Sequence, residues 1–504
     1  MGKTKTVIKN AIWDLGYYFI VILLGFLVPR YIILIYGSEV NGLSSVITQI
    51  LNVILLLQAG ATTAAIYLLY KPIADNDLLE ISKNILSTEK FFKKISYLFG
   101  VIMLIASVIT TVFIHSDIDS KFIFLAFIIM GLKSFLDLFF TSKYRVVFTA
   151  FQEKYIISIA TLIEQIIYYA LVFVTLYVKM HFIFIYIWLF IGCVVRIIYL
   201  EHNYKKYRKM LPRYEGEVSS KIKGRSYALA NEVAHSLVSS SVLIILSLFY
   251  GLKEASVYAI YAMATQAIGL VGASLYSSFA PSFGNLVAAE SKETTRRVLG
   301  LFQFIYVMMN SVMFYCMIVL IAPFAKIYTS GATDINYVNM MLASIMGISS
   351  IFSAYRIPYN IVVSACGYFK ETWKQPVLCV PISLFISIVF GRLDYSFILL
   401  GPASFYLINF LYQHFRIRGI APHLISKDIF LMFGISILGF FISATVSFLI
   451  PMPDGIAGWI IYLVVCIIVF SGYIVVASLL LVHKEAMGAF EYIISHFFRR
   501  NINA

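Results

Sequence analysis

Long apolar stretches recur along the whole chain, separated by short polar connections. A helix needs roughly 20 apolar residues to cross the hydrocarbon core of a bilayer. Stretches of about that length predict fourteen membrane-spanning helices, at 11–36, 43–70, 95–115, 121–148, 155–178, 182–200, 226–250, 256–280, 298–323, 337–364, 376–391, 397–414, 428–450 and 458–482. The pattern therefore predicts an all-α, polytopic membrane protein that crosses the bilayer an even number of times.

Lys and Arg residues fall almost entirely on alternate connections. With the amino terminus in the cytoplasm, 30 of the 39 lie in inner segments, 5 in outer segments and 4 within spans. This count assigns Lys121, at one end of the 121–148 stretch, to the outer connection, and Lys143 and Arg145, near the other end, to the inner one. Positive residues concentrate on the cytoplasmic side of membrane proteins. We therefore expect a multi-pass protein with both termini in the cytoplasm.

Composition agrees with a membrane protein and narrows its chemistry. Of the 504 residues, 61% are hydrophobic and 13% charged, and the mean hydropathy is +0.88. The net charge of +14 follows from the topology, so we expect no nucleic-acid partner. Five isolated cysteines and eight scattered histidines show neither a CxxC pair nor an HExxH motif, so no metal and no other cofactor is expected.

Two short segments repeat along the chain at nearly equal offsets. Residues 144–150 (YRVVFTA) correspond to 359–365 (YNIVVSA), 215 positions later, and Tyr36-Gly37 corresponds to Tyr250-Gly251, 214 positions later. Six predicted spans separate the copies, an even number, so both halves run in the same sense. The repeat predicts two parallel six-helix lobes around a central cleft, a geometry suited to alternating access.

We accordingly predict three regions. Residues 1–215 form an N-terminal lobe with spans one to six, and 216–425 form a C-terminal lobe with spans seven to twelve. Residues 426–504 add two spans and a cytoplasmic amphipathic tail, in which Phe490, Ile493, Ile494, Phe497 and Phe498 recur at helical spacing.

The first spans carry a family resemblance. An aromatic and aliphatic first span is interrupted by Pro29, and Gly37-Ser38-Glu39-Val40-Asn41-Gly42-Leu43 leads into the second. With fourteen spans in this order, the chain resembles the Wzx-type polysaccharide flippases of the multidrug, oligosaccharidyl-lipid and polysaccharide exporter superfamily. Such proteins often carry a basic residue a few positions after the proline, whereas here Arg30 follows it directly.

The resemblance implies a MATE-like fold in the bacterial plasma (inner) membrane. It implies a transporter, not an enzyme, that moves an undecaprenyl-pyrophosphate-linked oligosaccharide from the inner to the outer leaflet for O-antigen or capsule assembly. Its partners would be this substrate, membrane lipids, a polysaccharide polymerase and chain-length machinery. A monomer is expected, and the coupling ion, Na⁺ or H⁺, stays open.

Cations within spans are the best candidates for substrate binding, because a charge near the bilayer centre costs roughly 2.5–3.5 kcal/mol on insertion scales. These cations are Arg30, Lys133, Arg196 and Arg356. Arg356 has no acidic residue within a turn or two of its helix, which favours a cation in the cleft over one paired with another helix. Arg30 and Arg196 lie nearer helix ends, where a long side chain can instead snorkel to the interface.

Acidic and titratable groups within spans are candidates for ion coupling or ion pairing. They are Asp137, Glu164, Glu232 and His235. Asp137 lies four residues after Lys133, so the two form either a mutually neutralising pair or a cavity-facing site. Glu164 is a site for H⁺ or Na⁺ or the partner of Lys133 or Arg356. His235 belongs to a polar patch that includes Asn231 and Ser239.

Three other functions compete with this interpretation. A cation-coupled multidrug exporter of the same superfamily would favour an acidic cleft, whereas the deep charges here are mixed. A lipid II flippase shares fourteen spans and a cationic cleft. A membrane glycan polymerase or glycosyltransferase would need a sizeable extramembrane region, yet the longest predicted outer connection has about a dozen residues. The largest predicted inner loop is basic and contains no DxD motif.

Overall fold

The computed structural model describes residues 2–216, 228–289, 291–424, 428–453, 455–488 and 491. Every regular element within these ranges is a helix, which confirms the predicted all-α class. Thirteen helices there are long and apolar enough to cross a membrane, and a shorter apolar stretch, Leu23–Tyr36, lies in the first helix. Each of the fourteen predicted spans thus coincides with a helical segment.

The chain divides into two compact units. Unit 1 comprises Met1–Leu229 and Ser247–Ser256, and unit 2 comprises Ala230–Leu246 and Val257–Ala504. The three-region organisation expected from the sequence stays a prediction. The five apolar residues of its amphipathic tail lie outside the described residues: Phe490, Ile493, Ile494, Phe497 and Phe498.

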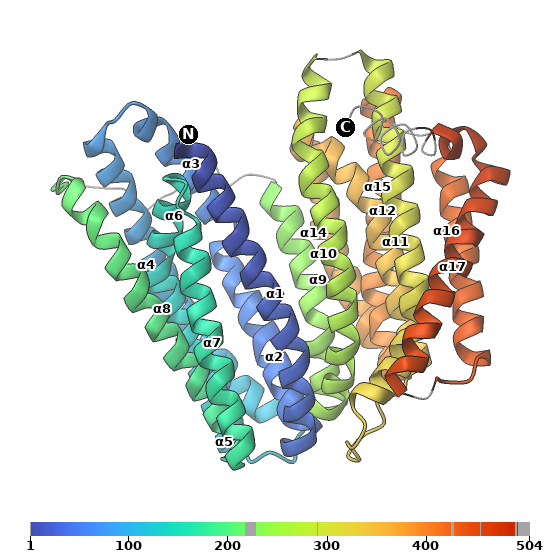
Figure 1. The fold of residues 1–504 in the computed structure, drawn as a ribbon, viewed down its shortest axis with the longest axis horizontal. Helices are drawn as coiled ribbons and strands as arrows, with labels where there is room; N and C mark the ends of the chain where they lie inside the picture. The colour runs from blue at the N-terminus through green and yellow to red at the C-terminus, as the bar shows by residue number, and fades with distance from the viewer. Residues whose placement is uncertain are drawn as a thin grey trace. The chain divides into compact units, whose positions relative to one another are not determined.

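Unit 1 is built from helices that lie side by side, coloured blue to green in Figure 1. They are α1 (Gly2–Tyr36), α2 (Ser38–Leu55), η1 (Leu56–Gln58), α3 (Ala61–Ala74), α4 (Leu78–Phe113), α5 (Ser120–Leu136), η2 (Asp137–Thr141), α6 (Ser142–Ala150), α7 (Tyr155–Val178) and α8 (Ile183–Met210). Two predicted spans are interrupted. The second breaks at Gly60, whose φ of 68° is left-handed, and the fourth contains the π-helical turn η2.

Unit 2 holds the remaining helices, coloured green to red in Figure 1. They are α9 (Ala228–Phe249), α10 (Leu252–Ala289), α11 (Lys292–Tyr328), α12 (Met340–Cys366), α13 (Phe369–Thr372), α14 (Lys374–Phe390), η3 (Tyr395–Leu399), α15 (Leu400–Ile420), η4 (Pro422–Leu424), α16 (Ile429–Leu449) and α17 (Gly455–Leu481). The corner between α9 and α10, Ser247–Ser256, belongs to unit 1.

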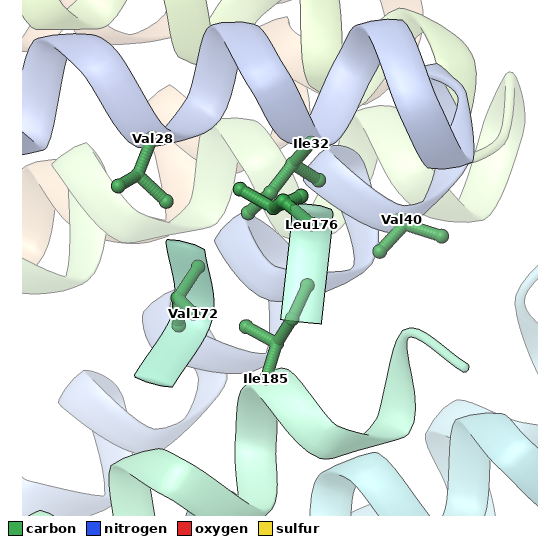
Figure 2. Close-up of a cluster of buried hydrophobic side chains, with 6 residues drawn as sticks. All are labelled: Val28, Ile32, Val40, Val172, Leu176 and Ile185. Atoms are coloured by element: carbon green, nitrogen blue, oxygen red, sulfur yellow. The ribbon is translucent and has the colours of Figure 1, made fainter. Parts of the chain in front are cut away.

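An apolar cluster joins α1 and α2 to α7 and α8 in unit 1. Figure 2 shows the side chains of α1 and α2 directed towards those of α7 and α8. The cluster consists of Val28, Ile32, Val40, Val172, Leu176 and Ile185. Lipid tails are as apolar as these side chains, so close packing rather than the hydrophobic effect stabilises such contacts in a membrane.

The two repeated Tyr-Gly corners meet within unit 1. Gly37 ends α1 with a φ of 86°, and Gly251 ends α9 with a φ of 107°, a region that glycine adopts without steric cost. The Asn41 amide donates to Ser256 Oγ at 2.8 Å, next to the close approach of Gly42 to the Leu252 backbone. The repeated glycines are therefore explained by the shape of the corner.

An ion pair reinforces the same corner on its exposed side. Lys253 Nζ lies 2.9 Å from Asp117 Oδ2 and 3.6 Å from Glu39 Oε1. Its hydrogen bond to Asp117 holds the pKa of that carboxyl below its ordinary value. The Glu39 carboxylate in turn accepts hydrogen bonds from Ser116 Oγ and the Asp117 backbone N–H. The α4–α5 loop is thus fixed to both corners.

The second repeated segment also has matching contacts in the two units. Tyr144 on α6 donates a hydrogen bond to Glu201 on α8, and the hydroxyl of Tyr359 on α12 lies 2.9 Å from Nδ1 of His414 on α15. In each unit, the repeated tyrosine ties its helix to the last helix of the half. The sequence repeat thus corresponds to a repeated contact.

Candidate functional site

A π-helical turn in the middle of unit 1 presents Asp137. The helix continues from α5 through η2 into α6, and the Thr141 hydroxyl donates to the Asp137 carboxylate. A π-turn inserts an extra residue and rotates the following side chains around the helix axis, and such turns are frequent at functional sites. Lys133 and Asp137 keep their one-turn spacing, whereas the residues after η2, Arg145 among them, are rotated relative to both.

Asp137 and Glu164 share a buried arginine. Arg196 on α8 places Nη2 2.5 Å from Asp137 Oδ1 and Nη1 2.6 Å from Glu164 Oε2. Arg145 on α6 places Nη2 2.6 Å from the other oxygen of Asp137. Arg196 is 6% exposed and Glu164 is 1% exposed, so these charges are compensated within the unit rather than by water.

Lys133 completes this network more loosely. Its Nζ lies 3.8 Å from Glu164 Oε1, beyond ordinary hydrogen-bond length, and its side chain is 24% exposed. The unit 1 network, defined as Lys133, Asp137, Arg145, Glu164 and Arg196, contains three cations and two carboxylates, a net charge of +1. The surplus positive charge lies in an apolar helix bundle, where it favours a nearby anion.

The contacts of unit 1 bear on alternatives that the sequence left open. Asp137 has Arg145 and Arg196 as its close ion-pair partners, and its carboxylate is not within ion-pair distance of Lys133. Arg196 does not snorkel to the interface but is buried between two carboxylates. Glu164 does lie at ion-pair distance from Lys133, one of the two partners considered for it.

Arg356 is a buried cation of unit 2. It lies on α12, is 5% exposed, and its guanidinium carbon is 5.9 Å from the ring centroid of Tyr406 on α15. No carboxylate in the described part of the chain lies within ion-pair distance of it, and its Nε has no hydrogen-bond partner there. Among the described residues, the cation thus faces an aromatic ring instead of a counter-ion.

The polar patch on α9 lies beside the same tyrosine. The ring of His235 is 5.1 Å from that of Tyr406, and Asn231 one turn earlier has a buried Oδ1 without a partner among the described residues. Glu232, the acidic candidate of this span, is exposed. The structure therefore brings His235 into the neighbourhood of Arg356 but leaves Glu232 outside it.

The last of the four candidate cations is Arg30. Arg30 is half-buried on α1, directly after Pro29. In the ranges that the structure describes, no three His, Cys, Asp or Glu side chains gather closely enough to hold a metal ion. The binding roles of the candidate residues and the lack of a cofactor stay predictions.

Sequence reasoning missed two polar residues of these clusters. Arg145 was assigned to an inner connection, because the π-turn that carries it back to Asp137 leaves no sequence signal. Asn409 on α15 is fully buried, and its amide oxygen and nitrogen have no partner among the described residues. The spacing of Tyr406, Asn409 and Gln413 marks one helix face and was the signal available.

Comparison with known proteins identifies the fold. No family model and no curated protein matches the chain. Among solved structures, an inward-facing multidrug resistance MATE family transporter of the MOP superfamily is 12% identical, with 82% of this chain and 99% of that chain covered and a TM-score of 0.64. Lipid II flippase MurJ in an inward closed conformation is 14% identical, with 91% and 98% covered and a TM-score of 0.61.

A third structure, of MATE in the bent conformation, is 12% identical and covers 83% of this chain and 96% of that chain, with a TM-score of 0.52. These helices therefore define a polytopic membrane protein. Its architecture is the MATE fold. Identities this low show the fold alone and leave the substrate open.

Proposed function

We propose that the chain is a transporter that flips an undecaprenyl-pyrophosphate-linked oligosaccharide from the inner to the outer leaflet of the bacterial plasma membrane by alternating access. Two observations support the proposal: the MATE fold, shared with transporters and with a lipid flippase, and cations buried in both units. A pyrophosphate is an anion, and a guanidinium fork matches its oxygens.

Arg356 is the observation that carries this proposal. A buried cation without a carboxylate partner is costly in a membrane, and it persists where function needs a charge. The surrounding tyrosines, Tyr406 at 5.9 Å and Tyr306 on the neighbouring α11, supply hydroxyl groups that can donate to phosphate or sugar oxygens. An anionic head group would therefore replace the counter-ion that the described residues lack.

The unit 1 network supports the proposal in a second way. Lys133 is 24% exposed and lies 3.8 Å from Glu164, so it is loosely paired and can offer the positive charge that the two carboxylates leave over. Arg196 is held by both carboxylates, so we assign it to fixing the network and Lys133 to attracting the substrate anion. Glu164 and Asp137 then set the position of these cations rather than binding a coupling ion.

Glycan delivery in vivo tests the assignment. Arg356→Ala and Lys133→Ala should each lower the delivery of surface polysaccharide strongly at matched expression, because each removes a cation that holds the anionic head group. Arg392→Ala, which removes an outer surface cation, is the matched control and should behave as wild type. Normal delivery by both deep variants would overturn the site.

A lipid II flippase is the second candidate. The match to MurJ spans more of this chain than the match to the inward-facing MATE transporter, 91% against 82%, as expected if the last two helices have counterparts in the flippase. Purified protein in proteoliposomes separates the candidates with three probes: an undecaprenyl-pyrophosphate oligosaccharide, lipid II and a cationic dye. Movement of the dye alone would favour a multidrug exporter instead.

The remaining expectations belong to the same proposal. The chain would act without a cofactor, as a monomer, beside a polysaccharide polymerase and chain-length machinery, with Na⁺ or H⁺ as the coupling ion and no nucleic-acid partner. We propose no enzymatic activity. The polymerase or glycosyltransferase alternative would be supported if the purified chain lengthened a lipid-linked glycan.

A further inference from the structure

The interface between α12 and α15 in unit 2 contains buried polar side chains, although two helices can pack through apolar side chains alone. Arg356 and Asn360 lie one turn apart on α12, and Asn409 and Gln413 lie one turn apart on α15. These four residues define the α12–α15 seam. Asn409 is 0% exposed and Gln413 is 2% exposed, so bulk water does not reach them in this state.

Two contacts fix the order of the residues along the seam. At one level Arg356 faces Tyr406, with 5.9 Å between guanidinium carbon and ring centroid. One turn further along α12, and two turns further along α15, Gln413 Nε2 donates to Asn360 Oδ1 at 3.1 Å. Asn409 follows Tyr406 by three residues and precedes Gln413 by four, so it lies on the same helix face between the two levels.

Hydrogen-bonding groups of the seam are left without partners within the described residues. They are Arg356 Nε, Asn409 Oδ1, Asn409 Nδ2 and Gln413 Oε1, two donors and two acceptors in neighbouring turns. Buried polar groups of this kind are almost always satisfied in folded proteins, by protein or by ordered water. A water molecule needs two to four such partners, and the seam offers both hydrogen-bond donors and acceptors.

We propose that the α12–α15 seam binds ordered water, which hydrates Arg356 from inside unit 2. Water accepts from Arg356 Nε and from the Asn409 amide, and donates to Asn409 Oδ1 and Gln413 Oε1. The guanidinium is thereby stabilised as a cation without a carboxylate, which would otherwise compete with an anionic ligand. This inference concerns the hydration of Arg356 and does not depend on which substrate the chain carries.

Unit 1 compensates its buried arginine differently. There Arg196 on α8, the last helix of the first half, is satisfied by Asp137 and Glu164. In unit 2 the last helix of the half, α15, carries the neutral Asn409 in its buried face. One unit thus compensates its buried arginine with carboxylates, and the other with neutral amides and water.

X-ray hydroxyl-radical footprinting of the full-length protein in nanodiscs tests the seam, because radicals generated from bound water modify the side chains next to it. Tyr406 and Tyr359, which are 8% and 3% exposed, should be modified several-fold faster than Tyr315, which is 0% exposed and whose hydroxyl donates to Ser436 O at 2.9 Å. Equal rates for all three in the wild type would overturn the proposal, without need of any variant.

Variants locate the water. Asn409→Leu should lower the modification of Tyr406 to the rate of Tyr315, whereas Asn409→Ser, which keeps a polar partner, should retain most of it. Asn310→Leu is the matched control: this amide of α11 is 3% exposed and donates to Tyr306 O at 2.8 Å, and its loss should leave Tyr406 unchanged. Unchanged modification in Asn409→Leu overturns the proposal. Loss of Tyr406 modification when sodium is replaced by choline would show that a sodium ion is bound at the seam. That result would also overturn the proposal.

Discussion

At the scale of single residues, the two units solve the problem of a buried arginine by different means. Arg196 is 6% exposed and shares two carboxylates, whereas Arg356 is 5% exposed and faces a tyrosine ring. Breaking a buried ion pair leaves a charge without compensation, which is costly. The first arginine should therefore matter mainly for stability, and the second mainly for what the protein binds.

Glu164→Gln measures the structural part of this division. The change keeps the shape of the side chain but removes the charge that Arg196 and Lys133 share, and it should lower the free energy of unfolding by about 3–5 kcal/mol. Thermal unfolding of the purified protein in detergent is the measurement. Arg145→Gln is the control, because this side chain is 37% exposed and its pair should contribute only about 0–1 kcal/mol. Equal melting temperatures for both variants would contradict the prediction.

At the scale of helices, the glycines of the repeated corner decide how closely two helix ends approach. A methyl group at Gly42 would lie 1.9 Å from the Leu252 carbonyl oxygen, which belongs to the backbone and cannot rotate away. The contact therefore requires the absence of a side chain on α2. Asn41 and Lys253 then add their polar contacts to a corner that already fits.

Gly42→Ala should accordingly destabilise the fold by about 1–3 kcal/mol, because the backbone must move to admit the methyl group. Gly269→Ala is the matched control, since this helical glycine of α10 has no atom within 4 Å of the added methyl group. There the better helix propensity of alanine should stabilise by up to about 1 kcal/mol. Denaturation midpoints of the two variants with opposite signs would support the assignment, and a neutral Gly42→Ala would refute it.

The sequence predicted the helices well and their interruptions poorly. Apolar length suffices to place a helix such as α7, whose bounds coincide with the predicted span 155–178. It does not reveal the π-turn η2, which rotates the residues after it, and Arg145 among them pairs with Asp137. Buried charges could be identified from the sequence because lipid excludes them, but their partners could not, since pairing depends on which helix faces meet.

At the scale of the whole molecule, the charge bias of the connections makes a prediction about orientation. Thirty of the 39 Lys and Arg residues fall on one side if the amino terminus is cytoplasmic, and such a bias sets the orientation of membrane proteins. Lys121, with a side chain 68% exposed at the start of α5, should then face the outside, and the exposed Lys209 at the end of α8 should face the cytoplasm.

Labelling of single cysteines in intact cells tests this orientation. Four of the five natural cysteines are buried, and all five can first be replaced by alanine to give a silent background. A membrane-impermeant maleimide should label Lys121→Cys in intact cells, but Lys209→Cys only after permeabilisation, because the bilayer separates the reagent from inner loops. The opposite pattern would invert the predicted topology, and with it the direction in which the proposed transport runs.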